Sequence, residues 1–316
     1  MDREDIYILN KHSNMTSHDV EGMLQQHVYN DKRSWSRFLR IFLIGLGVGF
    51  ATAGIVFFFA YNWADLNKFF KIGLIESLVA IATTLALYLK LNPLVRNIIL
   101  TGAAVLVGVL FSVFGQIYQT GANAYDFFLA WTIFITLWVL VSNFAPLWLL
   151  YLVLINTTLI LYAQQVANHW PETLLFTLLF AMNALVVVVA NLIQVRKRGI
   201  IIPTWFSNTV ALAAVVFGTI GIVIGIFDKF EIVFLLLILL MVSAYASGIR
   251  FGYLAKRIFF LSTIPFSSLI VLSAFLIRIG NSIQILFAVA ILVIIVVTAL
   301  IKTLISLQKQ WNNEKE

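Results

Sequence analysis

The chain has 316 residues, of which 61% are hydrophobic and only 11% charged, and its mean hydropathy is +0.98. Because a soluble domain carries about 25% charged residues, this composition excludes an ordinary soluble protein and indicates a chain surrounded by lipid. No compact basic domain carries the formal net charge of +7, so we expect no nucleic acid partner. The chain has no cysteine, which excludes disulfides, thiolate metal sites and cysteine nucleophiles.

The first 37 residues are polar and carry both signs of charge, and we expect residues 1–37 to form a short cytoplasmic helical segment. Thr16 or Ser17 is suited to cap a helix, with Asp19 in its first turn. Apolar residues then recur at helical spacing, at Val20, Met23, Leu24 and Val28. This stripe predicts a helix that rests on the protein's own cytoplasmic loops, with docking on the membrane surface or on a protein partner as the alternatives.

Ten apolar stretches follow, each long enough to cross about 30 Å of hydrocarbon as a helix. They lie near residues 39–61, 71–90, 97–118, 127–143, 146–164, 173–194, 205–227, 231–248, 258–277 and 282–305. We therefore expect an all-α fold, a polytopic transmembrane helix bundle of about ten spans that occupies residues 38–306. Residues 307–316 are expected to form a cytoplasmic tail. No cleavable signal peptide is evident, so the first span should remain as an anchor.

The basic residues are divided unevenly between the two sides that ten spans create. With the N-terminus in the cytoplasm, 17 of the 21 Lys and Arg residues fall on the cytoplasmic side. The other four are Lys68, Lys71, Lys229 and Arg278. Since basic residues gather in cytoplasmic loops, both termini are predicted to be cytoplasmic. The expected localisation is the cell inner (cytoplasmic) membrane, as a multi-pass protein.

Polar residues gather where this topology places the outer ends of the first four spans. Glu76 is the clearest, since a charged residue inside hydrocarbon is costly and usually faces the bundle interior or a wet cavity. It is either a proton or cation site or a structural carboxylate bonded to a neighbouring helix or reaching the interface. Aromatic residues at this depth are also typical of an interfacial belt. The candidate outer-rim site comprises Asn62, Trp63, Asp65, Glu76, Gln116, Tyr118 and Asp126. We expect no metal and no cofactor there.

Small and amide residues inside the spans predict helix contacts. Small residues recur at a spacing of four in Gly45–Gly49 and in Gly221–Gly225, which favours close helix packing at both places. Asn156 and Asn183 are buried in apolar stretches, where amides are expected to form hydrogen bonds between helices.

Two segments resemble signatures of a bacterial integral membrane family catalogued as domain of unknown function number 2157. They are Phe57–Trp63 with Leu66 and Phe69–Lys71, and Phe114–Gln119 with Phe127, Leu129 and Trp131. The resemblance covers about residues 10–165 and implies a bacterial integral membrane protein with an uncharacterised role. It carries over no catalytic residue, but it implies that the rim residues Asn62, Trp63, Gln116 and Tyr118 define the family.

Three hypotheses for function remain open. The first is transport or flipping of a small solute or an envelope lipid, which ten spans, Glu76 and the polar inner stripes favour. The second is a non-catalytic membrane scaffold or sensor for envelope partners, with a protein partner bound through residues 1–37. The third and least favoured is an intramembrane enzyme acting on a lipid-linked substrate, for which Asp126, Glu172, His169 and Glu76 could supply acid and base groups.

Overall fold

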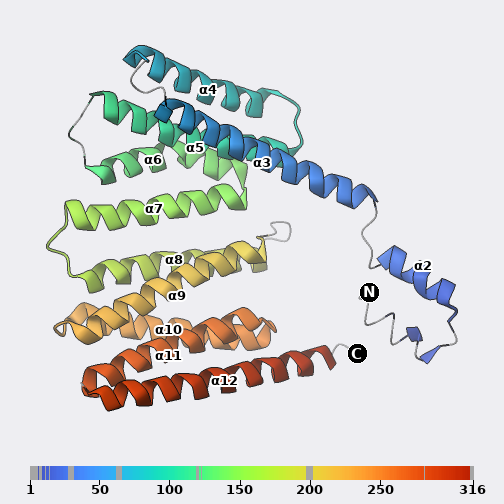
Figure 1. The fold of residues 1–316 in the computed structure, drawn as a ribbon, viewed down its shortest axis with the longest axis vertical. Helices are drawn as coiled ribbons and strands as arrows, with labels where there is room; N and C mark the ends of the chain where they lie inside the picture. The colour runs from blue at the N-terminus through green and yellow to red at the C-terminus, as the bar shows by residue number, and fades with distance from the viewer. Residues whose placement is uncertain are drawn as a thin grey trace. The chain divides into compact units, whose positions relative to one another are not determined.

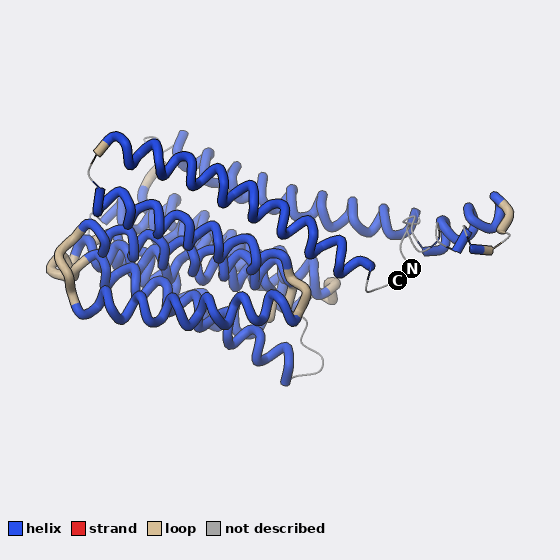
Figure 2. The backbone as a smooth tube through the Cα atoms, turned by 90° about the horizontal axis from the view of Figure 1, so that it is seen from below, coloured by secondary structure: helices blue, strands red, loops and turns tan. Residues whose placement is uncertain are grey.

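The computed structural model describes residues 6, 9–10, 12–13, 15–27, 32–61, 66–118, 121, 123–196, 202–280 and 282–313. These residues form eleven helices and no strand, as the tube in Figure 2 shows. The helices are α2 (Ser17–His27), α3 (Lys32–Tyr61), α4 (Lys68–Tyr88), α5 (Pro93–Tyr118), α6 (Ala124–Ser142), α7 (Ala145–Gln165), α8 (Glu172–Arg196), α9 (Thr204–Phe227), α10 (Ile232–Leu254), α11 (Ile258–Gly280) and α12 (Ile283–Asn313), labelled in Figure 1.

Helices α3 to α12 are each long and apolar enough to cross a membrane, so the described residues contain ten candidate spans. Each one coincides with a predicted span, and the all-α polytopic fold is confirmed. The largest differences in length are at α3 and α12. Helix α3 begins at Lys32 and so includes part of the predicted 1–37 segment, and α12 continues to Asn313 and so includes part of the predicted 307–316 tail. The protein is therefore a multi-pass helical membrane protein.

The outward faces of these helices are as apolar as their interiors. Phe50 on α3 is 72% exposed, Leu137 on α6 is 71% exposed and Ile232 on α10 is 82% exposed. A soluble monomer rarely leaves such a continuous apolar surface in water. In a bilayer the same faces contact acyl chains, and the helical backbone satisfies its own hydrogen bonds.

The chain divides into two compact units, and the first consists of residues 1–121, 140–142 and 316. In this unit α5 packs against both α3 and α4. Gly102 on α5 permits the contact with α3, because a Cβ there would lie 2.6 Å from Val48. On α5, the Asn97 side-chain amide donates to the backbone carbonyl of Ser142 at 3.2 Å.

The second unit consists of residues 122–139 and 143–315. Its most extensive helix contact joins α8 to α9, and α11 packs against α9, α10 and α12. One buried cluster of this unit is formed by Phe180 from α8, Ala214 and Ile222 from α9, and Leu237 and Met241 from α10. Consecutive helices alternate in direction (Figure 1). The last turns of α8 and α10 therefore lie on the same side of the unit as the first turns of α9 and α11.

The two predicted glycine contacts have different outcomes. A Cβ at Gly221 would lie 2.8 Å from both Leu237 of α10 and Phe176 of α8, so close packing is confirmed there. A Cβ at Gly45, Gly47 or Gly49 would meet nothing within 4 Å, so the prediction of close packing was wrong for α3 among the described residues. The contact of α3 with α5 is made through Val48 and Thr52 instead.

Helix α2 begins where the sequence predicts. The Thr16 side chain accepts a hydrogen bond from the Asp19 backbone at 3.3 Å, and the Asp19 carboxylate accepts from the Thr16 backbone at 3.1 Å. Val20, Met23 and Leu24 are partly buried while the residues around them are exposed, as the predicted stripe requires. Val28, the fourth residue of that stripe, lies outside the described residues.

Candidate functional site

The predicted outer-rim residues are divided among three parts of the chain. Asn62, Trp63 and Asp65 lie outside the described residues. Glu76, Gln116 and Tyr118 belong to the first unit, and Asp126 belongs to the second. Their grouping into one site therefore stays a prediction.

Within the first unit, Glu76 lies off the buried face of α4. That face is formed by Lys71, Ile75, Val79 and Ala86, whereas Glu76 is exposed. At the end of α5, Gln116 and Tyr118 are exposed as well, and the Tyr118 ring packs on Phe114 with centroids 4.5 Å apart.

In the second unit, Asp126 caps a helix. Its carboxylate accepts a hydrogen bond from the Asn123 backbone at 3.1 Å, at the start of α6. The neighbouring Tyr125 ring packs edge-to-face on Tyr162 of α7, with centroids 5.4 Å apart, and Tyr162 packs on Trp170 at 5.7 Å. Such a row of aromatic rings at helix ends fits an interfacial belt, which the sequence analysis gave as one interpretation of these residues.

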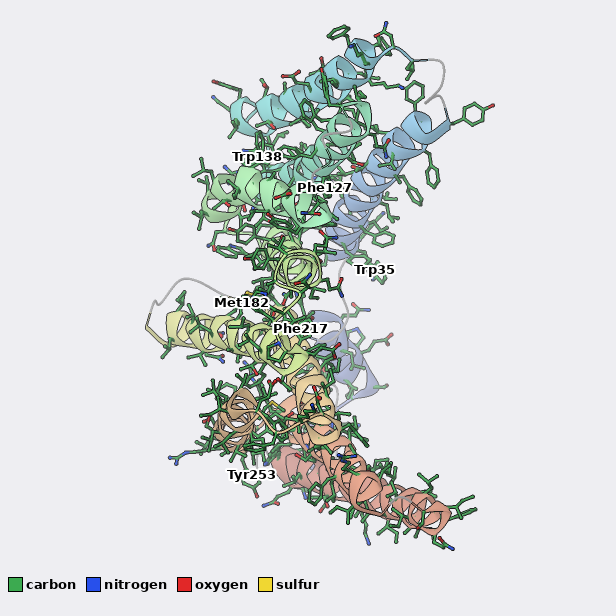
Figure 3. The ribbon with its side chains drawn as sticks, turned by 90° about the vertical axis from the view of Figure 1, so that its left-hand side faces the viewer. Trp35, Phe127, Trp138, Met182, Phe217 and Tyr253 are labelled. Carbon is green, nitrogen blue, oxygen red and sulfur yellow. The ribbon has the colours of Figure 1, made fainter. Side chains whose placement is uncertain are left out.

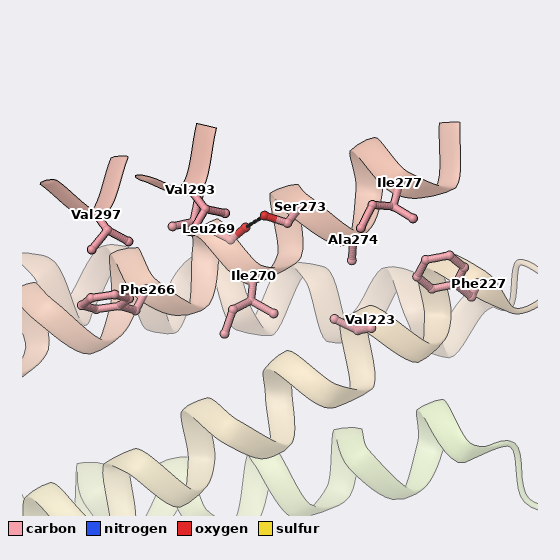
Figure 4. Close-up of a pocket in the computed structure, with 10 residues that line it drawn as sticks. All are labelled: Val223, Phe227, Phe266, Leu269, Ile270, Ser273, Ala274, Ile277, Val293 and Val297. Atoms are coloured by element: carbon pink, nitrogen blue, oxygen red, sulfur yellow. Dashed lines mark hydrogen bonds between the residues drawn. The ribbon is translucent and has the colours of Figure 1, made fainter. Parts of the chain in front are cut away.

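A hollow in the second unit lies between α9 and α11. It has a volume of about 540 Å³ and is lined by Leu212, Val215, Val216, Thr219, Ile220, Val223, Ile224, Ser262, Thr263, Phe266, Ser267 and Ile270. An adjoining cavity of about 480 Å³ shares Val223, Phe266 and Ile270 and continues against α12 (Figure 4). We call the two together the α9–α11 groove.

The groove follows α11 across most of the membrane. Its lining on that helix runs from Ser262 to Ile277. At 1.5 Å per residue this is about 22 Å, compared with about 30 Å of hydrocarbon. The lining is apolar except for hydroxyl groups. Its residues Val216, Ile220 and Ile270 lie in the middle of their helices and are exposed, so the groove is open at the side of these helices.

Three hydroxyl groups at the groove join three helices. Thr219 of α9 donates to its own helix at Val215 O, 2.6 Å away, and its oxygen lies 2.5 Å from the Ser267 hydroxyl of α11. Tyr245 of α10 bonds to the same Ser267 hydroxyl. Since each hydroxyl has one proton, the consistent order is Tyr245 to Ser267 to Thr219 to Val215 O. Every donor is used, so this network ties the helices together.

Pro265 is the sequence signal that could have marked the groove. It lies inside α11, where it removes one backbone hydrogen bond of the helix. Hydroxyl residues flank it at Ser262, Thr263 and Ser267, all of which line the groove. The sequence could not show that α9 faces this stretch, because α10 separates the two helices in the chain.

The expectation that amides inside the spans bond between helices is confirmed for Asn156 of α7 and Asn183 of α8. Asn183 donates to Asn156 Oδ1 at 2.8 Å and to Leu179 O at 2.8 Å. Asn156 donates to Leu152 O at 2.7 Å. Asn183 is only 2% exposed, and the pair satisfies amides that would otherwise be costly in lipid.

The charged residues of the second unit are unevenly divided between its two ends. The acidic residues of its described part are all at one end, at Asp126, Glu172, Asp228 and Glu231, where Lys229 and Arg278 also lie. The opposite end carries Arg250, Lys256, Arg257, Lys302 and Lys309, in the last turns of α10 and α12 and the turn before α11. We call these five residues the basic end.

No curated protein and no solved structure matches the chain. Residues 14–148 match the family described as Predicted membrane protein (DUF2157). This match includes both segments that carried the resemblance, and it covers α3 to α6. The resemblance is thus confirmed for residues 14–148, which are similar to the DUF2157 family of predicted membrane proteins.

Proposed function

We propose that the protein is a carrier of the bacterial inner membrane that takes a lipid from the bilayer into the α9–α11 groove and transfers it between the leaflets. The observation that carries this proposal is the groove itself, two adjoining cavities of about 540 and 480 Å³ that open to the side. A lateral opening admits a molecule that is already dissolved in the membrane.

The chemistry of the lining favours a lipid over a polar solute. Val216, Val223 and Ile270 supply apolar contacts of the kind an acyl chain needs. No carboxylate is buried among the described residues, and in the second unit the buried amide of Asn183 bonds to the partly buried amide of Asn156. A polar solute would therefore find few groups to replace its water.

The length of the groove supports transfer in addition to binding. Its lining covers about 22 Å of α11. The hydroxyl oxygens of Ser262, Ser267 and Ser273 recur along that length. The Ser273 hydroxyl donates to Leu269 O at 2.7 Å, which leaves a lone pair to accept a hydrogen bond from a passing headgroup (Figure 4).

Transfer of a fluorescent phospholipid across proteoliposome membranes tests the proposal. Dithionite bleaches only the label in the outer leaflet, so the protein should make more label bleachable than lipid alone allows. Val223→Trp, which fills the part shared by both cavities, should abolish this gain. Leu239→Trp on the exposed face of α10 is the matched control and should leave it unchanged. Equal transfer in wild type and Val223→Trp, with both folded, contradicts the proposal.

Glu76→Gln separates the groove from the outer-rim site. Glu76 belongs to the first unit and is exposed on α4, so the groove account expects unchanged lipid transfer in this variant. Loss of transfer in Glu76→Gln together with normal transfer in Val223→Trp would move the function to the outer rim.

The predicted orientation is part of the same proposal, with both termini in the cytoplasm. Because the natural chain has no cysteine, single introduced cysteines report topology without background. A membrane-impermeant maleimide added to intact cells should label Lys229→Cys and leave Lys309→Cys unlabelled. The reverse pattern rejects the orientation.

A further inference from the structure

We infer that the groove selects an anionic phospholipid, whose headgroup the basic end holds beside the first turn of α11. This inference rests on the proposed function, because it names the class of lipid that enters the same groove. The observation that carries it is that the basic end lies at one end of the apolar α9–α11 groove.

The charge of this region is one-sided in the sequence. Residues 232–313 contain no Asp or Glu, and their basic residues are Arg250, Lys256, Arg257, Arg278, Lys302 and Lys309. All but Arg278 belong to the basic end. The acidic residues in the described part of the second unit lie at the opposite helix ends. Glu314 and Glu316 follow this range in the sequence and lie outside the described residues.

The turn between α10 and α11 holds Arg257 in a defined place. Its backbone N–H donates to Gly252 O at 2.8 Å, and Lys256 before it has a left-handed φ of 51°. The Arg257 guanidinium lies over the Phe251 ring, 5.6 Å from the centroid. A guanidinium fixed in this way can bind a phosphate through two hydrogen bonds with little loss of freedom.

The end of α12 lies beside this turn. The Tyr253 ring packs edge-to-face on Trp311, with centroids 6.1 Å apart, and Figure 3 labels Tyr253 near the end of α10. This contact brings the last turns of α12, with Lys309, to the same end as Arg257. The basic residues of α10, of α12 and of the turn before α11 therefore contribute to one region of positive electrostatic potential.

The groove begins within reach of this turn. Its first lining residue on α11 is Ser262, four residues after the helix start at Ile258. Four residues span about 6 Å along a helix axis. The lining of the two cavities does not include Arg257, so a phospholipid with its phosphate at Arg257 must extend its acyl chain along about one helical turn to reach the groove. Basic pockets between membrane helices are known to recognise anionic headgroups in this way.

Native mass spectrometry of the full-length chain in detergent tests the inference with two lipids of identical chains, phosphatidylglycerol and phosphatidylcholine. Wild type should retain phosphatidylglycerol more strongly. Arg257→Gln should weaken that retention about fivefold, the size expected for one cation near an anionic headgroup, and leave phosphatidylcholine unchanged. Arg257→Lys keeps the charge and should keep most of the preference. Arg278→Gln removes a cation from the other end of the same helix and should behave as wild type.

The outcomes separate the two proposals. Equal loss of phosphatidylglycerol in Arg257→Gln and Arg278→Gln, or equal retention of both lipids by wild type, overturns the headgroup site. Loss of both lipids in Val223→Trp together with unchanged lipid preference in Arg257→Gln keeps the groove and removes the headgroup site. A preference lost in Arg257→Gln but unaffected by Val223→Trp keeps the headgroup site and removes the groove. A melting curve for each variant excludes unfolding as the cause.

Discussion

Helix α3 in the first unit and helix α9 in the second carry small residues at the same spacing of four, yet their surroundings differ. None of the apolar window of α3 is buried within the chain, whereas 44% of that of α9 is buried. Gly45 and Gly49 face open space, while Gly221 lies against Leu237 and Phe176. The comparison teaches that a small residue only permits close approach in lipid, and that a bulky partner on the neighbouring helix decides whether the contact forms.

The largest expected effect follows from filling the close contact on α9. Gly221→Val places a branched side chain where a Cβ alone would lie 2.8 Å from Leu237 and Phe176. Overpacking of this kind costs about 1–3 kcal/mol, and the melting temperature of the purified protein should fall clearly. Gly45→Val is the matched control on α3 and should change the melting temperature little. A larger loss in Gly45→Val would show that α3 has a close neighbour after all.

A smaller effect is expected from the amides inside the spans, which differ in whether they have a partner. Asn156 and Asn183 bond to each other, whereas the amide oxygens of Asn97 in the first unit and Asn208 in the second have no partner among the described residues. Asn183→Leu should cost about 1 kcal/mol, because it leaves the Asn156 amide oxygen unpaired. Asn97→Leu should cost less. Denaturant melts of both variants check this, and the reverse order would mean that the first unit depends more on its amide.

The hydroxyl network allows a comparison inside one site. Ser267→Ala removes the central group and leaves the Tyr245 hydroxyl without its acceptor, while Tyr245→Phe removes only the first donor. Ser267→Ala should therefore be the more destabilising, by about 1 kcal/mol or less. Thermal melts that give equal values would mean that the proposed direction of donation is wrong.

The smallest effect concerns α2, outside the membrane. Hydrogen bonds from the Thr16 hydroxyl and then from the Thr16 backbone lower the pKa of Asp19 below its ordinary value of 3.8. A depressed carboxyl pKa contributes stability above the unfolded value, and the contribution is lost as the pH falls through the folded value. A carbon-13 NMR titration should place the Asp19 midpoint below 3.8, and Thr16→Val should move it up. An unchanged midpoint in Thr16→Val contradicts the cap.

The sequence predicted the spans, and it predicted that amides inside them bond between helices, because a long apolar stretch is stable only in lipid and an amide there must find a partner. It did not predict that Asn156 pairs with Asn183, because the partner depends on which helices are neighbours. The groove could not be predicted, since it depends on α9 and α11 being neighbours across α10. Hydropathy gives the length of a helix but not its neighbours. For the same reason the glycines of α3 and α9, which share a spacing of four, predicted close packing at both places.

Cross-linking by a phospholipid with a photoactivatable acyl chain tests the groove most directly, because it needs no substitution in the protein. The protein is irradiated in nanodiscs that contain this lipid, and the adducts are mapped by mass spectrometry. The groove account predicts adducts concentrated on Val216, Ile220, Phe266 and Ile270. It predicts few on the equally exposed Leu235 and Leu239 of α10. Adducts spread over all lipid-facing helices in proportion to their exposure would contradict it.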